Sequence, residues 1–168
     1  HDTAYDAQRD AVVLFGGATI SFAGARPRDE TWELSVEAAF DRFGHGCATP
    51  AGMPALATVD GRRPELGRAL VLEVAPVPAT APTLLLIGLD DQHWGGVSLP
   101  FDLDAVGMPG CGLLVAIDAV EPMTVAGGAA QRTLQVPLDR GLLGQSVFVQ
   151  AFVAGVATSD AGRLLIGN

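Results

Sequence analysis

The residues best suited to acid–base or metal chemistry are three histidines, His1, His45 and His93, which are scattered along the chain. No H-E-x-x-H pair and no clustered Cys/His arrangement accompanies them, so the sequence does not predict a zinc site. The serines in "GGVSLP" and "GQSVFV" lack the G-x-S-x-G pattern that places a nucleophile on a strained turn. We therefore expect a protein without catalytic residues.

A copper site on His1 is one alternative. An N-terminal histidine offers an amine and an imidazole to the same ion, and His45 or His93 could supply a third nitrogen, which suits copper. An ordinary disordered chain end is the simpler interpretation of His1. A copper-dependent oxidoreductase is thus an alternative hypothesis, which a titration with Cu(II) tests.

Four aspartates flank predicted strands and offer the hard oxygen ligands that calcium prefers, namely Asp90, Asp91, Asp102 and Asp104. Their spacing lacks the EF-hand pattern, and aspartate at a strand end ordinarily serves as a turn residue. We therefore expect no cofactor, with calcium as the alternative.

Trp94 follows the polar residues "DDQH". An exposed tryptophan beside Asp90 and Asp91 is a platform on which a sugar ring or a partner's side chain stacks. The interpretation we favour is a core aromatic that caps the fold, because tryptophan is largely buried in most proteins. A carbohydrate-binding module built on Trp94 and these carboxylates is the alternative. Trp32 is assigned to packing.

Composition excludes several classes of protein. The 168 residues carry 19 acidic and ten basic side chains, a net charge of −9, which repels nucleic acid and anionic lipid surfaces. The longest apolar runs, such as "TLLLIGL", are far shorter than the roughly 20 residues that span a bilayer. The 21 glycines and 11 prolines are typical of short strands joined by turns. No basic-then-apolar leader opens the sequence, as expected if a signal peptide is absent or already removed.

From residue 62 onward, short apolar segments alternate with turn signals. "ALVLEVA" places Leu70, Leu72 and Val74 on one face, while "TLLLIGL" and "GLLVAI" are apolar on both faces and predict central strands. The proline in "TLQVPL" predicts an edge strand or a bulge. With "ALATVDG", "GVSLPFDL", "SVFVQAFVAG" and "RLLIG" we count about eight strands, so the predicted fold is all-β, an antiparallel β-sandwich.

The first forty residues form a separate segment. "TWELSVEAAFDRF" fits both a helix and a strand, and we predict a strand over 31–37 because Trp32, Leu34 and Val36 alternate with polar residues. Glycines and prolines crowd the residues that follow, which places a boundary at 38–48. We therefore predict a β segment over 1–40 and a sandwich over 41–168.

"YDAQRDAVVLFGG" and "DETWEL" resemble a kelch repeat, in which an apolar strand ends on a glycine pair and an aspartate-plus-tryptophan strand follows. The resemblance covers residues 1–37 and implies one blade of a propeller. No second copy of the pattern occurs in 41–168, and one repeat cannot bury its faces alone. The segment is thus either the last blade of a longer propeller or a strand group that completes a neighbouring sheet. The matched residues are Tyr5, Asp6, Arg9, Val12, Val13, Leu14, Phe15, Gly16, Gly17, Asp29, Thr31 and Trp32.

Cys47 and Cys111 are the only cysteines, and both lie in glycine-rich turns without metal-type spacing. Their setting favours a disulfide in an oxidising compartment over two buried free thiols. Residues 44–168 also resemble a C-terminal module of modular exported bacterial proteins, through pieces such as "GHGCATPAG", "VGMPGCGLL" and "LLGQSVFVQAFV". That resemblance implies an extracellular β-domain with the two cysteines paired and no catalytic residues.

The leading hypothesis is a secreted or cell-surface, non-catalytic structural or interaction module. It associates with a protein partner or with itself, with the exchange of strands as one route of assembly.

Overall fold

The computed structural model describes residues 2–7, 11–22 and 24–168, and the protein is all-β, as the sequence predicts. In the described residues, helical structure is limited to the 3₁₀ turns η1 (Val59–Gly61), η2 (Asp104–Val106) and η3 (Arg140–Leu142). No helix in this part of the chain is long and apolar enough to cross a membrane.

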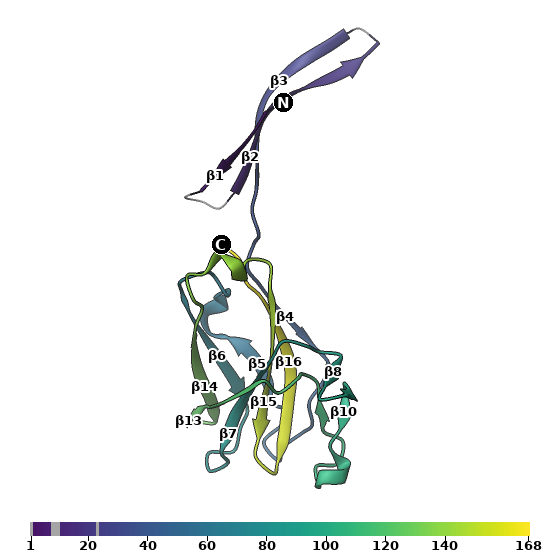
Figure 1. Ribbon diagram of the computed structural model, residues 1–168. Coiled ribbons are helices and arrows are strands. Elements are labelled where there is room, and N and C mark those ends of the chain that lie inside the picture. Colours follow the sequence, from purple (N-terminus) through teal and green to yellow (C-terminus); the bar gives the residue numbers. More distant parts are fainter. Residues whose placement is uncertain (1, 8–10, 23) are drawn as a thin grey trace.

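Two antiparallel sheets pack face to face as a sandwich (Figure 1). The first has the order β12-β7-β15-β16-β4, with strands β4 (Ala39–Phe43), β7 (Thr83–Gly88), β12 (Ala119–Pro122), β15 (Ser146–Val153) and β16 (Ala157–Leu165). The second has the order β13-β14-β6-β5, with strands β5 (Ala55–Thr58), β6 (Ala69–Ala75), β13 (Thr124–Ala126) and β14 (Ala129–Gln135).

The core lies between these sheets and follows the alternation of the strands. On β6, Leu70, Leu72 and Val74 are all buried, which confirms the predicted inner face, and Val149 and Val153 of β15 are buried in the same cluster. Fully burying each such side chain stabilises the fold by about 1.5–3 kcal/mol.

The prediction that "GLLVAI" forms a central strand is wrong. Only Gly112–Leu113, strand β11, is extended, and it pairs with β10 (Phe101–Asp102) outside the two main sheets. The following residues are buried, but the Leu114 N–H donates to the Gln150 side chain and the Ala116 N–H to the Asp90 carbonyl. Because these partners replace a strand ladder, the apolar run covers the sandwich as a buried loop.

The edge or bulge predicted from "TLQVPL" is also wrong. β14 lies inside its sheet, between β13 and β6, and ends at Gln135, so Pro137 follows the strand. Proline cannot donate to a ladder, and here the strand ends before that donor is needed.

A three-stranded antiparallel sheet forms the N-terminal part, from β1 (Asp2–Asp6), β2 (Ala11–Ser21) and β3 (Gly24–Leu34), in the order β1-β2-β3. Figure 1 shows this sheet, here called the arm, projecting away from the sandwich. The register shifts between Phe15 and Gly17, where Gly16 and Gly17 adopt positive φ of 68° and 140°. The glycine pair therefore makes an irregularity inside one strand pair.

The strand predicted over 31–37 ends at Leu34, and a short linker, 35–38, leads to β4. The linker contacts the C-terminus, because the Asn168 N–H donates to the Val36 carbonyl at 2.9 Å. The Arg140 guanidinium of η3 donates to the carbonyl of Ala7, next to β1. These two contacts connect the arm to the sandwich.

Candidate functional site

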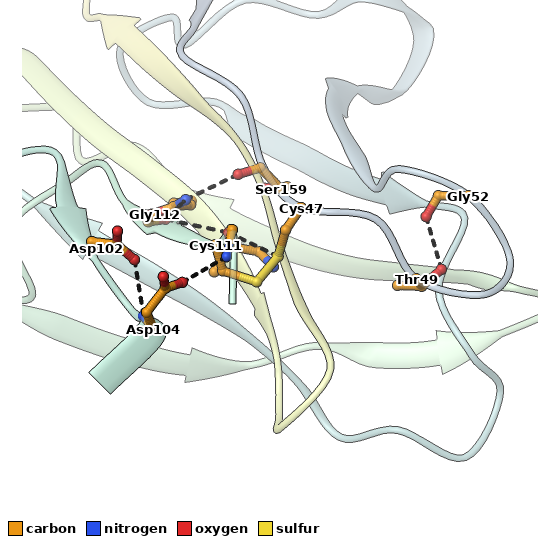
Figure 2. Close-up of a disulfide and its surroundings, with 11 residues drawn as sticks. Cys47, Thr49, Gly52, Asp102, Asp104, Cys111, Gly112 and Ser159 are labelled. Carbon is orange, nitrogen blue, oxygen red and sulfur yellow. Dashed lines mark hydrogen bonds between the residues drawn. A yellow bond between two sulfur atoms is a disulfide. The ribbon is translucent and has the colours of Figure 1, made fainter. Parts of the chain in front are cut away.

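Cys47 and Cys111 form a disulfide, with their Cα atoms 4.8 Å apart and both residues buried (Figure 2). The disulfide favoured by the sequence is therefore present. The bond joins residues 64 positions apart, and closing a loop of that length stabilises the fold by about 4 kcal/mol in the chain-entropy account.

A buried glutamine holds the chain around this disulfide. The side chain of Gln150 is fully buried on β15; its Oε1 accepts from the Leu114 N–H, and its Nε2 donates to the carbonyls of Gly112 and Ser159, each at 2.9 Å. A buried amide is costly unless its hydrogen bonds are made, and here three backbone groups share it. Gln150 thus fixes the 112–114 segment against β15 and β16.

Thr158 of β16 ties the other side of the disulfide. Its N–H donates to Cys47 Sγ at 3.1 Å, its carbonyl accepts from the Cys47 N–H at 3.0 Å, and its hydroxyl donates to the Gly112 carbonyl at 3.2 Å. Gly46 permits this approach, because a Cβ there would lie 1.9 Å from the Thr158 oxygen. The two cysteine turns are therefore held rigidly.

A hollow of about 360 Å³ lies beside the disulfide, with His45, Phe101, Asp102 and Leu114 among its lining residues. At its rim, Asp102 and Asp104 act as turn residues, the role that the sequence favours. Asp102 Oδ1 accepts from the Asp104 N–H at 2.9 Å, and Asp104 Oδ1 accepts from the Gly110 N–H at 2.7 Å (Figure 2). Both carboxylates order a surface turn.

The structure does not gather the predicted metal ligands. Among the described residues, no group of three or more His, Cys, Asp or Glu is placed to hold a metal ion. His1 lies outside the described residues, His45 is at the hollow, and His93 Nδ1 lies 3.9 Å from Asp90 Oδ2 in another loop.

Trp94 lies in a small hairpin formed by β8 (His93–Trp94) and β9 (Val97–Ser98). It is 39% exposed, and its indole Nε1 donates to the Ile117 carbonyl at 3.3 Å. The polar edge of the indole is anchored on the buried loop, while part of the ring contacts solvent.

Asp90 organises the turn before Trp94. Its Oδ1 accepts from the Gln92 N–H at 2.7 Å and from the His93 N–H at 3.3 Å. These bonds, that from Gln92 first, hold the pKa of the Asp90 carboxyl below its usual value. Asp90 therefore stays ionised and occupied as a turn acceptor, and Asp91 follows it in the same loop.

One face of the arm is mainly apolar. Residues directly opposite in an antiparallel ladder point to the same face, and side chains alternate along each strand, so every second row along β2 lies on the same face. Tyr5, Trp32 and Leu34 on this face are between 58% and 68% exposed. We call this surface the arm face; it consists of Tyr5, Val12, Leu14, Trp32 and Leu34.

The outer edge of β3 carries features that discourage pairing with another strand. Arg26, Pro27, Arg28, Asp29 and Glu30 follow one another along it, beside the register shift. Charges, proline and irregular register are the means by which natural sheets prevent edge-to-edge pairing. The face of the arm is therefore better suited to contact than its free edge.

Sequence reasoning did not single out Gln150 or the arm face. A lone glutamine in the apolar run "SVFVQAFV" signals a buried polar group. Tyr5 and Trp32 of the arm face belong to the kelch-like pattern, where they are expected to pack. Their exposure depends on the lack of a second layer over this face, which no local sequence pattern encodes.

Comparison with protein-family models, with curated proteins and with solved structures finds no match to this chain.

Proposed function

We propose that the protein is a non-catalytic, extracellular interaction module that assembles by packing the arm face against another β-sheet. The exposed apolar arm face is the observation that carries this proposal. A sheet normally buries one face against a second layer, and a large apolar patch on a surface marks a binding site.

The arm face exposes large apolar side chains that an association would bury. Trp32 and Leu34 are 65% and 68% exposed and lie two residues apart on β3, on the same face. Val12 and Tyr5 lie across the sheet in the same row as Leu34. Fully burying a large apolar side chain contributes about 1.5–3 kcal/mol, and exposed aromatic residues are the usual anchors of interfaces. Such a group therefore supports a protein contact more readily than a small-molecule site.

Three other features support the proposal. The buried disulfide suits an oxidising compartment, which favours the extracellular location. The kelch-like pattern lies in the arm, where a blade-like sheet packs its face on a neighbour. The discouraged edge of β3 favours packing by faces over the exchange of strands.

The test compares two paired substitutions by light scattering across a concentration series. Trp32→Ser with Leu34→Ser alters the arm face, and Leu89→Ser with Val106→Ser alters two equally exposed residues of the sandwich, at 70% and 66%. We expect the wild type and the sandwich variant to associate as concentration rises, and the arm variant to stay monomeric. Melting temperatures should barely change, because exposed substitutions cost little. A wild-type protein that stays monomeric throughout, or an arm variant that associates like the wild type, contradicts the proposal.

Carbohydrate binding at Trp94 is a second candidate, favoured by the anchored and partly exposed indole. A ring fixed by its own N–H presents a face for stacking at low entropic cost. Glycan-array binding that Trp94→Ala abolishes and Trp94→Phe partly keeps would support it, and an array without signal for the wild type would refute it.

A further inference from the structure

A mainly apolar cavity of about 330 Å³ lies between the two sheets of the sandwich. Leu70 and Leu134 line it from the four-stranded sheet. Val147 and Leu164 line it from the five-stranded sheet. Figure 1 shows the C-terminus at the end of the sandwich that carries the arm, and Ile166, near that terminus, also lines the cavity. The cavity is therefore at the arm end of the sandwich.

The cavity reaches the hydrophobic core. Leu70 and Leu164, which line it, both belong to the core cluster. Among the described residues, those that line the cavity include no acidic side chain and no arginine or histidine. A charged or strongly polar group buried there would find few partners, which is costly. The buried part of a ligand must therefore be apolar.

Backbone hydrogen bonds between chain segments order the walls. The Gly167 N–H donates to the Pro64 carbonyl at 3.3 Å, and the Val136 N–H donates to the Arg68 carbonyl at 3.0 Å. Pro64 and Val136 both line the cavity. Because these segments are tied to each other, the cavity is formed before a ligand arrives, and binding loses less entropy.

Positive charge gathers on two segments that contribute to the walls, 62–70 and 134–142. They carry four arginines against two acidic residues, a net charge of +2 in a chain whose net charge is −9, namely Arg62, Arg63, Arg68 and Arg140 against Glu65 and Asp139. Arg68 pairs with Glu65 at 2.9 Å, and Arg63 pairs with the exposed Glu37 at 3.8 Å. Arg62 and Arg140 make no ion pair in the part of the chain that the structure describes. An anionic group beside the cavity therefore meets net positive charge.

We propose that this cavity binds a single aliphatic chain that ends in an anionic group, such as the carboxylate of a fatty acid. The chain lies between the sheets, and its anionic end remains at the surface among the arginines of segments 62–70 and 134–142. The inference goes beyond the proposed function and does not depend on association through the arm face.

The size and chemistry of the cavity favour this ligand. Its volume of about 330 Å³ is at the lower end of small-ligand sites, which span about 300–1,000 Å³, so one chain suits it. An unfilled apolar cavity lacks packing contacts that methylene groups restore. A sugar would place hydroxyl groups against leucine and valine side chains, which cannot bond to them.

The first experiment varies the chain and its end by calorimetric titration of the intact protein. Hexanoate, octanoate and decanoate should bind at one site per chain, with affinity rising roughly fourfold for each methylene that the cavity buries. Decanol and decylamine keep the chain of decanoate and change its end. We expect decanol to bind more weakly than decanoate, and decylamine to bind about tenfold more weakly or worse.

Each outcome of these titrations decides a part of the inference. Absence of binding by decanoate and decanol alike overturns the site. Binding of decanoate and decylamine with equal affinity overturns the anionic end. Affinity that does not depend on chain length shows that the chain is not buried, and also overturns the site.

A second experiment locates the ligand by NMR. In a sample saturated with decanoate, nuclear Overhauser effects should connect the ligand's methylene protons with the methyl groups of Leu134, Val147 and Leu164. Effects to other methyl groups only would place the ligand elsewhere and contradict the inference.

Two variants with matched controls complete the test. Leu142→Trp enlarges a partly buried lining residue of η3 and should weaken decanoate binding tenfold or more, whereas Leu89→Trp, at a residue 70% exposed and outside the lining, should not. Arg62→Gln with Arg140→Gln should weaken the binding of decanoate and not of decanol, whereas Arg26→Gln with Arg28→Gln on the arm should change neither. Unaltered decanoate affinity in the Leu142→Trp variant overturns the site, and unaltered affinity in the Arg62 and Arg140 variant overturns the role of these arginines. Light scattering of the same samples reports the proposed function separately.

Discussion

Gln150 makes three buried hydrogen bonds beside the disulfide. It satisfies the Leu114 N–H and the carbonyls of Gly112 and Ser159 while making no contact with water. Its cost of burial is offset only because all three bonds are made. A polar side chain in this strand thus selects one conformation for a loop that contains no regular ladder.

Replacing Gln150 with methionine should destabilise the protein by about 3 kcal/mol or more. The substitution keeps the volume but leaves the Leu114 N–H and the Ser159 carbonyl without this partner, at about 1–3 kcal/mol each, whereas the Gly112 carbonyl keeps the Thr158 hydroxyl. Urea unfolding measures the change, and Gln92→Met on the exposed turn is the control, with an expected effect within about 0.5 kcal/mol. Equal stability of the two variants would contradict the role assigned to Gln150.

Asp90 gives a pH-dependent prediction. Its pKa in the folded protein is below the ordinary value of 3.8, mainly because of the bond from the Gln92 N–H. The ionised carboxylate therefore contributes stability that is full above pH 3.8 and is lost as the pH falls through the folded pKa. The free energy of unfolding of wild type minus Asp90→Asn should shrink on acidification. A difference that is constant or grows at low pH would contradict this assignment.

At the scale of elements, the alternation of apolar and polar residues along a strand correctly predicted which side chains face the core. β6 shows this best, because Leu70, Leu72 and Val74 alternate with less buried residues and all face the core. The segment "GLLVAI" shows the limit, since an apolar run states that residues are buried but not how their backbone hydrogen bonds are made. The loop there depends on Gln150 and Asp90, which are distant in sequence.

Only part of the candidate site could be predicted from the sequence. The cysteines could be paired from their setting, and the aspartates could be assigned to turns. The hollow beside the disulfide could not be predicted, because it arises where the 44–46 and 110–114 segments meet in space. Exposure of the arm face depends on the separation of arm and sandwich, which no local pattern encodes.

The edge of β3 gives a prediction at this scale. Pro27→Val with Asp29→Val removes a proline and a charge that discourage strand pairing, so the variant should form thioflavin-binding aggregates faster than the wild type. Pro137→Val, in the segment after β14, is the matched control and should leave the aggregation rate unchanged. If both variants aggregate at the wild-type rate, the edge of β3 is not protected by these residues.

At the scale of the whole molecule, the sandwich and the arm differ in what they bury and what they expose. The sandwich holds the hydrophobic core and the disulfide, and beside them the buried Gln150 side chain of β15 makes three hydrogen bonds. The arm presents Tyr5, Trp32 and Leu34 to solvent and is held at its base. Such a division suits a module that is anchored by one part and associates through the other.

The proposal that the protein associates through the arm face is tested most directly by measuring whether Trp32 becomes covered. In a Trp94→Phe background Trp32 is the only tryptophan, so acrylamide quenching of its fluorescence reports access to the arm face. We predict that quenching is strong in dilute protein, where Trp32 is 65% exposed, and falls as concentration rises, together with a blue shift of the emission. Quenching that stays equally strong at the highest attainable concentration would show that nothing covers the arm face, and would contradict the central claim.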